Sequence, residues 1–241
     1  MSNAPLDCSL CSRLCTSRRT VVNGVGPKDA RIMVISCNPD TMDEKHGEPL
    51  YHRAWAGKKV RKYLLPLAGI DPNEVRYENI VRCNPPRGKK GKAGTPTAKE
   101  IETCRMFLAE SIDSINPDYI ITLGAAALKW FLPDEKISEV HGQTFYMDGM
   151  FIKEGQFKMW EIHPMLHPDN AKPSYNPKLA LVMDEDWRRL GESLNGTSIH
   201  SVSDNDRSVP VRIHGREDAE VGKYNIVSAL KLNRLMRKAL C

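Results

Sequence analysis

Four cysteines in two distant pairs are the feature that most constrains this chain. Cys8 and Cys11 stand in a C-S-L-C run near the start of the sequence, whereas Cys83 and Cys104 lie on either side of a basic segment in its middle. Four thiolates are the ligand set of a [4Fe-4S] cluster, and a tetrahedral zinc ion takes the same ligands. Either group would tie an N-terminal arm to elements in the middle of the chain. Ordinary buried cysteines are the alternative.

The cysteine content and the N-terminus indicate where such a protein resides. Seven cysteines are an odd number, and a C-x-x-C pair fits a metal site in a reducing compartment better than a disulfide framework. The opening residues, M-S-N-A-P-L-D-C, lack the charged and apolar regions of a signal peptide, and no run approaches the ~18 apolar residues of a membrane span. With 41% hydrophobic residues, we expect a globular cytoplasmic protein that makes no membrane contact.

The net charge of +5 is mild, but it is distributed unevenly. Between Arg82 and Lys99 the chain carries six Lys and Arg residues, interleaved with Gly and Pro, and no acidic residue. Such a segment predicts a basic loop that binds phosphate groups. A solvated surface loop is the alternative, but the position between two of the paired cysteines favours a binding role. The residues expected to contact phosphates are Arg87, Lys89, Lys90 and Lys92.

Strand-like and helix-like patterns alternate along the first 194 residues. Short apolar runs are typical of buried strands, and repeats at i, i+3, i+4 and i+7 are typical of helices. The alternation predicts an α/β fold, a three-layer α/β/α sandwich with a central, mostly parallel sheet, and active sites of such folds lie outside the carboxyl ends of the strands. The expected strands are 30–36, 75–81, 119–123 and 160–162, and the expected helices are 60–67, one that follows a Thr97-x-x-Glu100 capping box, 124–132 and 184–194.

Residues 195–241 differ in character from residues 1–194. A polar break begins at Asn195, and only near Tyr224 does an amphipathic pattern return, with Lys and Arg on its polar face. We expect one domain over residues 1–194 and a C-terminal extension over 195–241 that carries a basic amphipathic helix. That helix either packs on the domain with its basic face in solvent or makes a second contact with nucleic acid.

Motifs in a fixed order give the residues from about Cys8 to Leu194 a family resemblance. They are the N-terminal C-x-x-C, V-V-N-G-V-G-P-K-D-A-R-I-M-V-I, a G-E-P that begins at Gly47, E-N-I-V-R-C-N-P-P, G-T-P-T-A-K-E-I-E-T-C, I-N-P-D-Y-I-I-T-L-G-A-A-A and I-H-P. In this order they resemble the uracil-DNA glycosylase superfamily, most closely its iron-sulfur branch, family four. The resemblance implies an α/β/α fold, a structural [4Fe-4S] cluster on the four paired cysteines, and a monofunctional enzyme that hydrolyses the base–sugar bond of a flipped nucleotide in DNA. Cys15 is an alternative N-terminal ligand.

The resemblance also assigns roles to polar residues that follow the strands. Asn79 matches the residue whose side-chain amide reads the base edge, and His163 matches the one that donates a hydrogen bond to a pyrimidine oxygen. His167, in a second His-Pro pair, is expected to contact DNA. Without the resemblance, an Asn after a strand is often a turn residue and His-Pro a loop corner.

The first motif departs from the family pattern. The iron-sulfur branch usually has Gly-Glu-Ala-Pro-Gly, whereas this chain has S-C-N-P-D at residues 36–40, so the acidic residue is gone. We expect Asn38 to hold the attacking water by its amide, although an amide does not remove a proton as a carboxylate does. Asp40 is the acid expected to take the catalytic role, with Asp43 and Glu44 as neighbouring candidates and solvated turn residues as the alternative.

The stacking motif is altered as well. Where the branch usually has Pro-Phe-Val-Gly, this chain has P-L-Y-H at residues 49–52, with Trp55 close behind. An aromatic ring stacks well on a base, so Tyr51 is the expected stacking residue and His52 is expected to bind the base beside it.

These changes fall on the pocket and spare the scaffold, which favours a changed substrate. The first hypothesis is a glycosylase for a larger or modified pyrimidine, such as a hypermodified base of phage DNA, with a role in antiviral defence. The second is a uracil-DNA glycosylase of base-excision repair with an unusual pocket. The third is a non-catalytic iron-sulfur protein that binds DNA. We expect a monomer whose partner is DNA.

Overall fold

The computed structural model describes residues 3–88, 94–149, 158–174 and 176–196. A single five-stranded sheet with the order β2-β1-β3-β5-β4 organises them. Its first four members in that order run parallel, and β4 runs antiparallel to β5. The strands are β1 (Ile32–Ser36), β2 (Val75–Asn79), β3 (Tyr119–Leu123), β4 (Phe145–Gly149) and β5 (Lys158–Met165).

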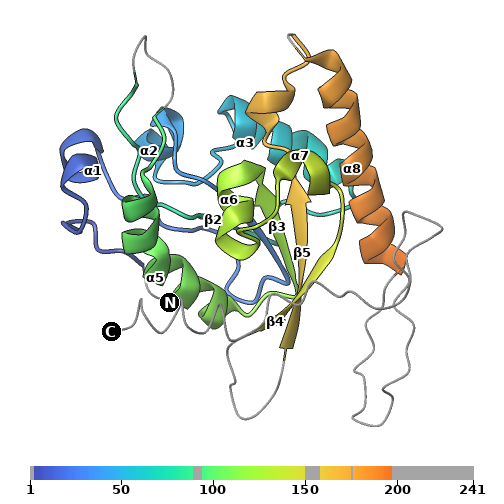
Figure 1. Cartoon of the computed structure of the whole chain (residues 1–241), viewed down its shortest axis with the longest axis horizontal. Helices are drawn as coiled ribbons and strands as arrows, with labels where there is room; N and C mark the ends of the chain where they lie inside the picture. Colours follow the sequence, from blue (N-terminus) through green and yellow to red (C-terminus); the bar gives the residue numbers. More distant parts are fainter. Residues whose placement is uncertain (1–2, 89–93, 150–157, 175, 197–241) are drawn as a thin grey trace.

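Helices cover both faces of the sheet, which confirms the predicted α/β/α sandwich (Figure 1). One buried cluster joins the sheet to α5 and α6, and a second joins its other face to the helical segment 55–67 and α8. The helical elements are α1 (Ser12–Ser17), α2 (Thr41–His46), α3 (Trp55–Lys59), a π-helical segment η1 (Val60–Leu64), α4 (Leu65–Leu67), α5 (Ala98–Ile115), α6 (Gly124–Phe131), α7 (Ile137–Val140), a 3-10 helix η3 (Pro168–Ala171) and α8 (Pro177–Gly196).

The central strands are apolar almost throughout because both of their faces are buried. In β1, Met33 and Ile35 enter the cluster under α5 and α6, whereas Val34 enters the cluster under α8. Parallel strands between two helical layers show this near-continuous apolar pattern. The pattern therefore located β1 and β3 from the sequence.

β1 and β2 are shorter than the predicted 30–36 and 75–81, and two other strands differ more from the sequence prediction. β4 was not predicted, because its sequence F-Y-M-D-G is short and it pairs with β5 alone at the edge of the sheet. β5 is longer than the predicted 160–162, because Pro164 continues the strand and pairs with Thr122 instead of opening a turn.

The predicted helices are present with shifted ends. The Thr97–Glu100 capping box begins α5 as expected, and α8 begins earlier than predicted, at Pro177. Residues 197–241, which include the predicted amphipathic helix, lie outside the described residues. None of the described helices is long and apolar enough to cross a membrane.

Two segments far apart in the sequence meet at the N-terminal end of α5. Figure 1 shows α1 beside α5, where Arg13 contacts Glu100 at 2.6 Å.

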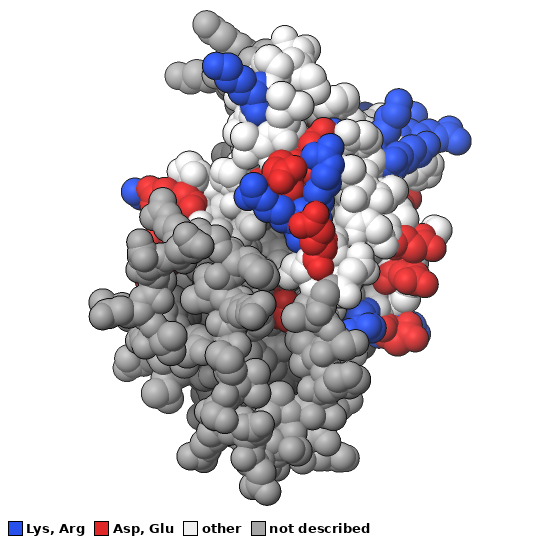
Figure 2. Space-filling model, turned by 90° about the vertical axis from the view of Figure 1, so that its right-hand side faces the viewer, with Lys and Arg blue, Asp and Glu red and all other residues white. Residues whose placement is uncertain are grey.

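Figure 2 shows the face on the side of α8, where acidic and basic side chains are interspersed among the residues that the structure describes. On α8, Arg188 and Arg189 both pair with Glu185. Mixed charge of this kind on α8 does not favour binding of a DNA backbone to that helix.

Candidate active site and cysteine pocket

The carboxyl-end edge of the sheet holds a buried amide without a partner. Asn79 ends β2 in register with Ser36, the last residue of β1, and is 1% exposed. Neither its Nδ2 nor its Oδ1 has a hydrogen-bond partner among the described residues. An unpaired buried polar group costs about 1–3 kcal/mol, so such a group needs a reason to persist. A base edge that accepts a hydrogen bond from Nδ2 and donates one to Oδ1 would satisfy both atoms and thus explain why they are unpaired in the protein alone.

His167 brings an imidazole to the same edge, just before η3. Its Nε2 lies 3.5 Å from Ser36 Oγ, and its Nδ1 accepts a hydrogen bond of 3.2 Å from the backbone N–H of Asp169. Because Nδ1 accepts, the neutral ring carries its proton on Nε2. Burial lowers the pKa of His167, which favours this neutral form. The site therefore holds a neutral N–H donor aimed toward Ser36.

A glycine sets how closely the His167 ring approaches. Gly124, at φ +80°, begins α6 directly after β3, and a Cβ at this position would lie 3.0 Å from His167 Cβ. The left-handed φ and this close approach both favour glycine. The G-A-A-A sequence at the start of α6 thus gives His167 its place.

His163 does not reach this edge, which argues against its predicted role as donor to a pyrimidine oxygen. It lies two residues before the end of β5, opposite Ile121, and is 3% exposed. Its Nδ1 is 3.3 Å from Thr144 Oγ1, and its Nε2 is 3.6 Å from Glu161 Oε2. The His163 ring therefore lies over a face of the sheet, two residues before β5 ends. His167, predicted only as a DNA contact, lies beyond the end of β5 and next to Ser36. The sequence signal was the second His-Pro pair, which follows the strand.

In the altered first motif, Asn38 lies two residues after the end of β1, whereas Asp40 caps α2. Asn38 is half-buried, and its Nδ2 donates to the carbonyl of Pro39 at 2.9 Å. Asp40 is exposed and caps α2, where its Oδ1 accepts from the N–H groups of Met42 at 2.6 Å and Asp43 at 2.8 Å. This capping role argues against Asp40 as the catalytic acid, since its carboxylate is held by backbone donors.

The two neighbouring acids, Asp43 and Glu44, also accept hydrogen bonds from backbone N–H groups. Asp43 accepts from the N–H of Tyr51 at 2.7 Å, and burial raises the pKa of Asp43 to about 6. Glu44 accepts from the N–H of Arg19 at 2.6 Å and from the side chain of Asn84 at 3.3 Å. Both carboxylates therefore join the first motif to the segments around it.

Tyr51 and His52 belong to an aromatic stack that is already formed. The Tyr51 ring lies 3.9 Å from His46 with 7° between the planes, and 4.6 Å from His52 with 56° between the planes. Tyr51 is only 7% exposed, so the structure argues against its predicted use as an open stacking surface. Leu50, at φ +50°, stands where the family pattern has Phe and is buried in the α8-side cluster.

The described residues on either side of the basic segment lie next to each other. A Cβ on Gly94 would lie 2.2 Å from the carbonyl oxygen of Pro86, so the two ends of the segment are adjacent. Arg87 is exposed, and its Nη2 lies 3.4 Å from Thr41 Oγ1 at the start of α2. The predicted contacts Lys89, Lys90 and Lys92 lie outside the described residues.

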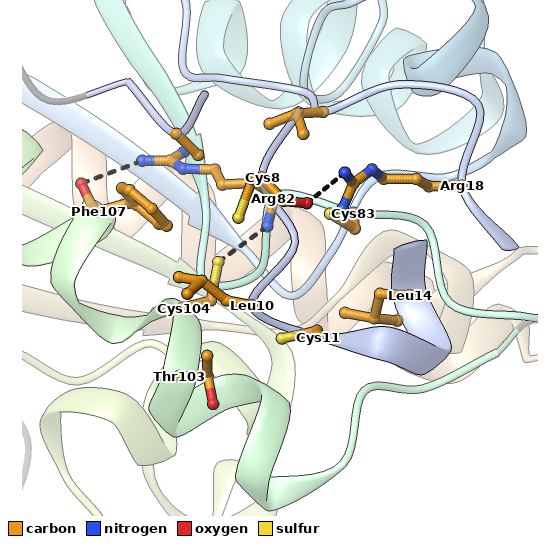
Figure 3. A pocket seen from close by; sticks show the side chains of 12 residues that line it. Cys8, Leu10, Cys11, Leu14, Arg18, Arg82, Cys83, Thr103, Cys104 and Phe107 are labelled. Carbon is orange, nitrogen blue, oxygen red and sulfur yellow. Dashed lines mark hydrogen bonds between the residues drawn. The ribbon is translucent and has the colours of Figure 1, made fainter. Parts of the chain in front are cut away.

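The four paired cysteines line a single pocket between the N-terminal arm, the end of the β2 segment and α5 (Figure 3). All four are free thiols. Cys15 is not among the lining residues, because its Sγ donates to the carbonyl of Cys8 at 3.3 Å. The lining is otherwise largely apolar and includes Ala4, Leu10, Leu14, Val21 and Phe107.

The pocket supplies N–H donors to two of the sulfurs. Arg18 Nη1 lies 3.4 Å from Cys83 Sγ, and the backbone N–H of Arg82 lies 3.4 Å from Cys104 Sγ. Burial raises the pKa of the Cys83 thiol, an effect that Arg18 opposes, and raises the pKa of Cys104 to about 11. Hydrogen bonds to sulfur in a sheltered apolar pocket suit an iron-sulfur cluster. Within the described ranges, no group of three Cys, His, Asp or Glu side chains is placed to hold a single metal ion.

Comparison with known proteins identifies the family. The model of the uracil DNA glycosylase superfamily matches residues 23–190. A type-4 uracil-DNA glycosylase of Thermotoga maritima is 37% identical over 179 residues, which are 74% of this chain and 85% of that protein. A type-4 uracil-DNA glycosylase of Saccharolobus solfataricus is 29% identical over 199 residues, which are 80% of this chain and 84% of that protein. With this coverage and the sheet described above, the chain belongs to the uracil-DNA glycosylase superfamily, whose members are hydrolases of the base–sugar bond.

Proposed function

We propose that this protein is a DNA glycosylase whose base-binding site is the edge formed by Asn79, Ser36 and His167. The unpaired amide of Asn79 carries the proposal, since a flipped base would satisfy the two buried polar atoms that the fold leaves open. Membership of the superfamily supports the same reaction class.

The reaction needs stabilisation on both sides of the bond that breaks. As the bond between C1′ and the base nitrogen lengthens, the sugar becomes cationic and the electron pair passes to the departing pyrimidine. The Nε2–H of a neutral His167 donates to the pyrimidine oxygen where this negative charge develops. Asn79 holds the base edge, and Asn38 orients the water that adds to C1′. The proton that this water loses passes through solvent to the departing pyrimidine anion, so the products are the free base and a hydroxyl at C1′. The neutral ring of His167 already carries the Nε2–H and keeps it throughout.

The substrate we propose is a modified pyrimidine, as in hypermodified phage DNA, with a role in antiviral defence. Cys37 stands where the family pattern has Glu, and burial raises the pKa of this thiol to about 12, so the position carries no charge at neutral pH. Leu50 replaces a Phe, and a smaller apolar side chain leaves more room beside the base. Both changes alter the pocket and leave Asn79 and a histidine donor in place.

Two other functions remain as alternatives. The type-4 uracil-DNA glycosylases that match over most of their length favour uracil as the substrate. The missing carboxylate in the first motif favours a protein that binds DNA and does not cleave it. The two alternatives predict different products from the same set of DNAs: free uracil in the first case and no released base in the second.

We further propose that Cys8, Cys11, Cys83 and Cys104 hold a [4Fe-4S] cluster. The shared pocket, its apolar lining and the N–H donors on two sulfurs support this assignment. When bound, the cluster would supply a structural cross-link between the N-terminal arm and α5. Cys15 lies outside the pocket lining, which favours Cys8 and Cys11 as the N-terminal ligands.

The remaining proposals concern partners and organisation. Arg87 and the lysines of the basic segment bind DNA phosphates, and residues 195–241 form an extension separate from the domain. We also propose that the protein is monomeric and cytoplasmic.

The experiment that tests the function offers matched DNAs to the purified protein. One arm uses oligonucleotides that contain uracil, and the other uses phage DNAs with hypermodified pyrimidines. Alkali-labile abasic sites and free base, identified by mass spectrometry, are the readouts. We expect base release from modified DNA in preference to uracil DNA. Release of uracil at an equal or greater rate would support base-excision repair, and tight binding with no abasic product would support the non-catalytic alternative.

A further inference from the structure

Arg18 is placed to serve the cysteine pocket in a way that none of the ligand assignments requires. It follows directly after α1, and its guanidinium turns back toward the pocket (Figure 3). Nη1 lies 3.4 Å from Cys83 Sγ and 3.3 Å from Cys15 Sγ, and Nη2 donates to the carbonyl oxygen of Cys8. One side chain thus joins the backbone of the N-terminal arm to a sulfur in the middle of the chain.

The positive charge of Arg18, unlike that of Arg82, is not compensated by a described carboxylate. Arg18 and Arg82 are the two cationic residues of the pocket lining. Arg82 Nη1 pairs with the fully buried carboxylate of Glu78, which also accepts from Arg76 Nε at 2.9 Å. Arg18 makes no ion pair with a described carboxylate, and its guanidinium contacts two sulfurs and a carbonyl oxygen. Its positive charge is therefore directed at the sulfurs.

A thiolate-ligated cluster is an anion, and its stability depends on hydrogen bonds to its sulfurs and on nearby charge. A guanidinium N–H that donates to a ligating thiolate is a charge-assisted hydrogen bond, which is stronger than a neutral one. The contact between Nη2 and the Cys8 carbonyl fixes the arm at the same time. One residue thereby satisfies both requirements of the site, orientation of two ligands and compensation of charge.

We infer that Arg18 is a positioning residue for the iron-sulfur cluster: it orients Cys8 and Cys83 and compensates the charge of the thiolates, which slows iron loss and raises the reduction potential. This inference rests on the proposed cluster. Cys15 then acts beside the cluster and not as a ligand, because its Sγ shares the same Nη1 and donates to the same carbonyl as Arg18 Nη2.

The test compares Arg18→Met with Arg18→Lys in the full-length, iron-containing protein. Met keeps the apolar stem without charge, and Lys keeps the charge without the planar fork. Iron release to a chelator, followed by loss of visible absorbance, should be about tenfold faster or more in Arg18→Met. The midpoint potential for one-electron reduction with dithionite should shift to a more negative value in Arg18→Met and shift less in Arg18→Lys.

Two controls separate this role from general stability. Arg19→Met changes the neighbouring arginine, whose side chain is not part of the pocket lining, and should leave both readouts unchanged. Cys15→Ala removes the competing sulfur and should not accelerate iron release. Iron in the wild type with unchanged release and potential in Arg18→Met would overturn the inference alone. A wild type purified anaerobically without iron would overturn the cluster proposal and the inference together.

Discussion

Replacing Asn79 by Leu should stabilise the protein and abolish its activity. Asn79 is 1% exposed and both of its amide atoms lack partners among the described residues. Each unpaired buried group costs about 1–3 kcal/mol, and Leu has the same branching at Cγ without polar atoms. Part of the gain is lost because Leu is larger than Asn. We therefore expect the free energy of unfolding of Asn79→Leu to rise by about 1 kcal/mol.

Urea unfolding and single-turnover base release measure the two effects. The midpoint of Asn79→Leu should rise at an unchanged m-value, while cleavage falls by about 10²-fold or more. Asn23 provides a matched control, because its amide is satisfied by the N–H and C=O of Ala4 at 2.9 and 3.0 Å. Asn23→Leu should destabilise the protein and leave the chemical step intact. A loss of stability in Asn79→Leu with normal cleavage would refute the reasoning.

Three further changes test the other parts of the structure. Cys104→Ser should lose iron and Cys15→Ser should retain it, as measured by iron content; equal loss would return Cys15 to the ligand set. Glu100→Gln should flatten the acid dependence of stability: Arg13 lowers the pKa of Glu100 to about 2, so the stabilisation present above the usual carboxyl range is lost as pH falls toward 2. Because Arg13 is 40% exposed, screening limits the effect to about 1 kcal/mol, and identical urea-unfolding curves for wild type and variant across pH 2–6 would contradict it. Replacing Lys89, Lys90 and Lys92 by Ala should lower the log-log salt slope of DNA binding by roughly 0.7–0.9 for each lost phosphate contact, and an unchanged slope would leave the segment a solvated loop.

The buried parts of the fold were predictable because burial on two faces leaves a clear pattern. β1 and β3 are apolar runs, and the Thr97–Glu100 box begins α5 where expected. β4 was missed because an edge strand that pairs on one side needs little apolar sequence. Pro164 suggested a turn, since proline donates no hydrogen bond to a ladder, yet it lies within β5.

The sequence motifs pointed to the edge of the sheet where we propose the site, but they did not distinguish its residues. The structure places Asn79 at the end of β2, although the expected strand ran on to residue 81, and two His-Pro pairs four residues apart offered equal motifs and different positions. Only the length of β5 shows that His163 lies inside the sheet and His167 beyond it. Likewise, the sequence does not reveal that Asp40 caps α2 or that Tyr51 is stacked on His46.

We propose that His167, and not His163, serves the chemical step. Single-turnover base release by His167→Ala and His163→Ala, on the substrate that the wild type cleaves best, tests it most directly. We predict a loss of about 10²-fold or more in His167→Ala with nearly unchanged DNA affinity. For His163→Ala we predict lower stability and a chemical step close to that of the wild type. The reverse pattern, with the chemical step lost in His163→Ala and kept in His167→Ala, would contradict the account.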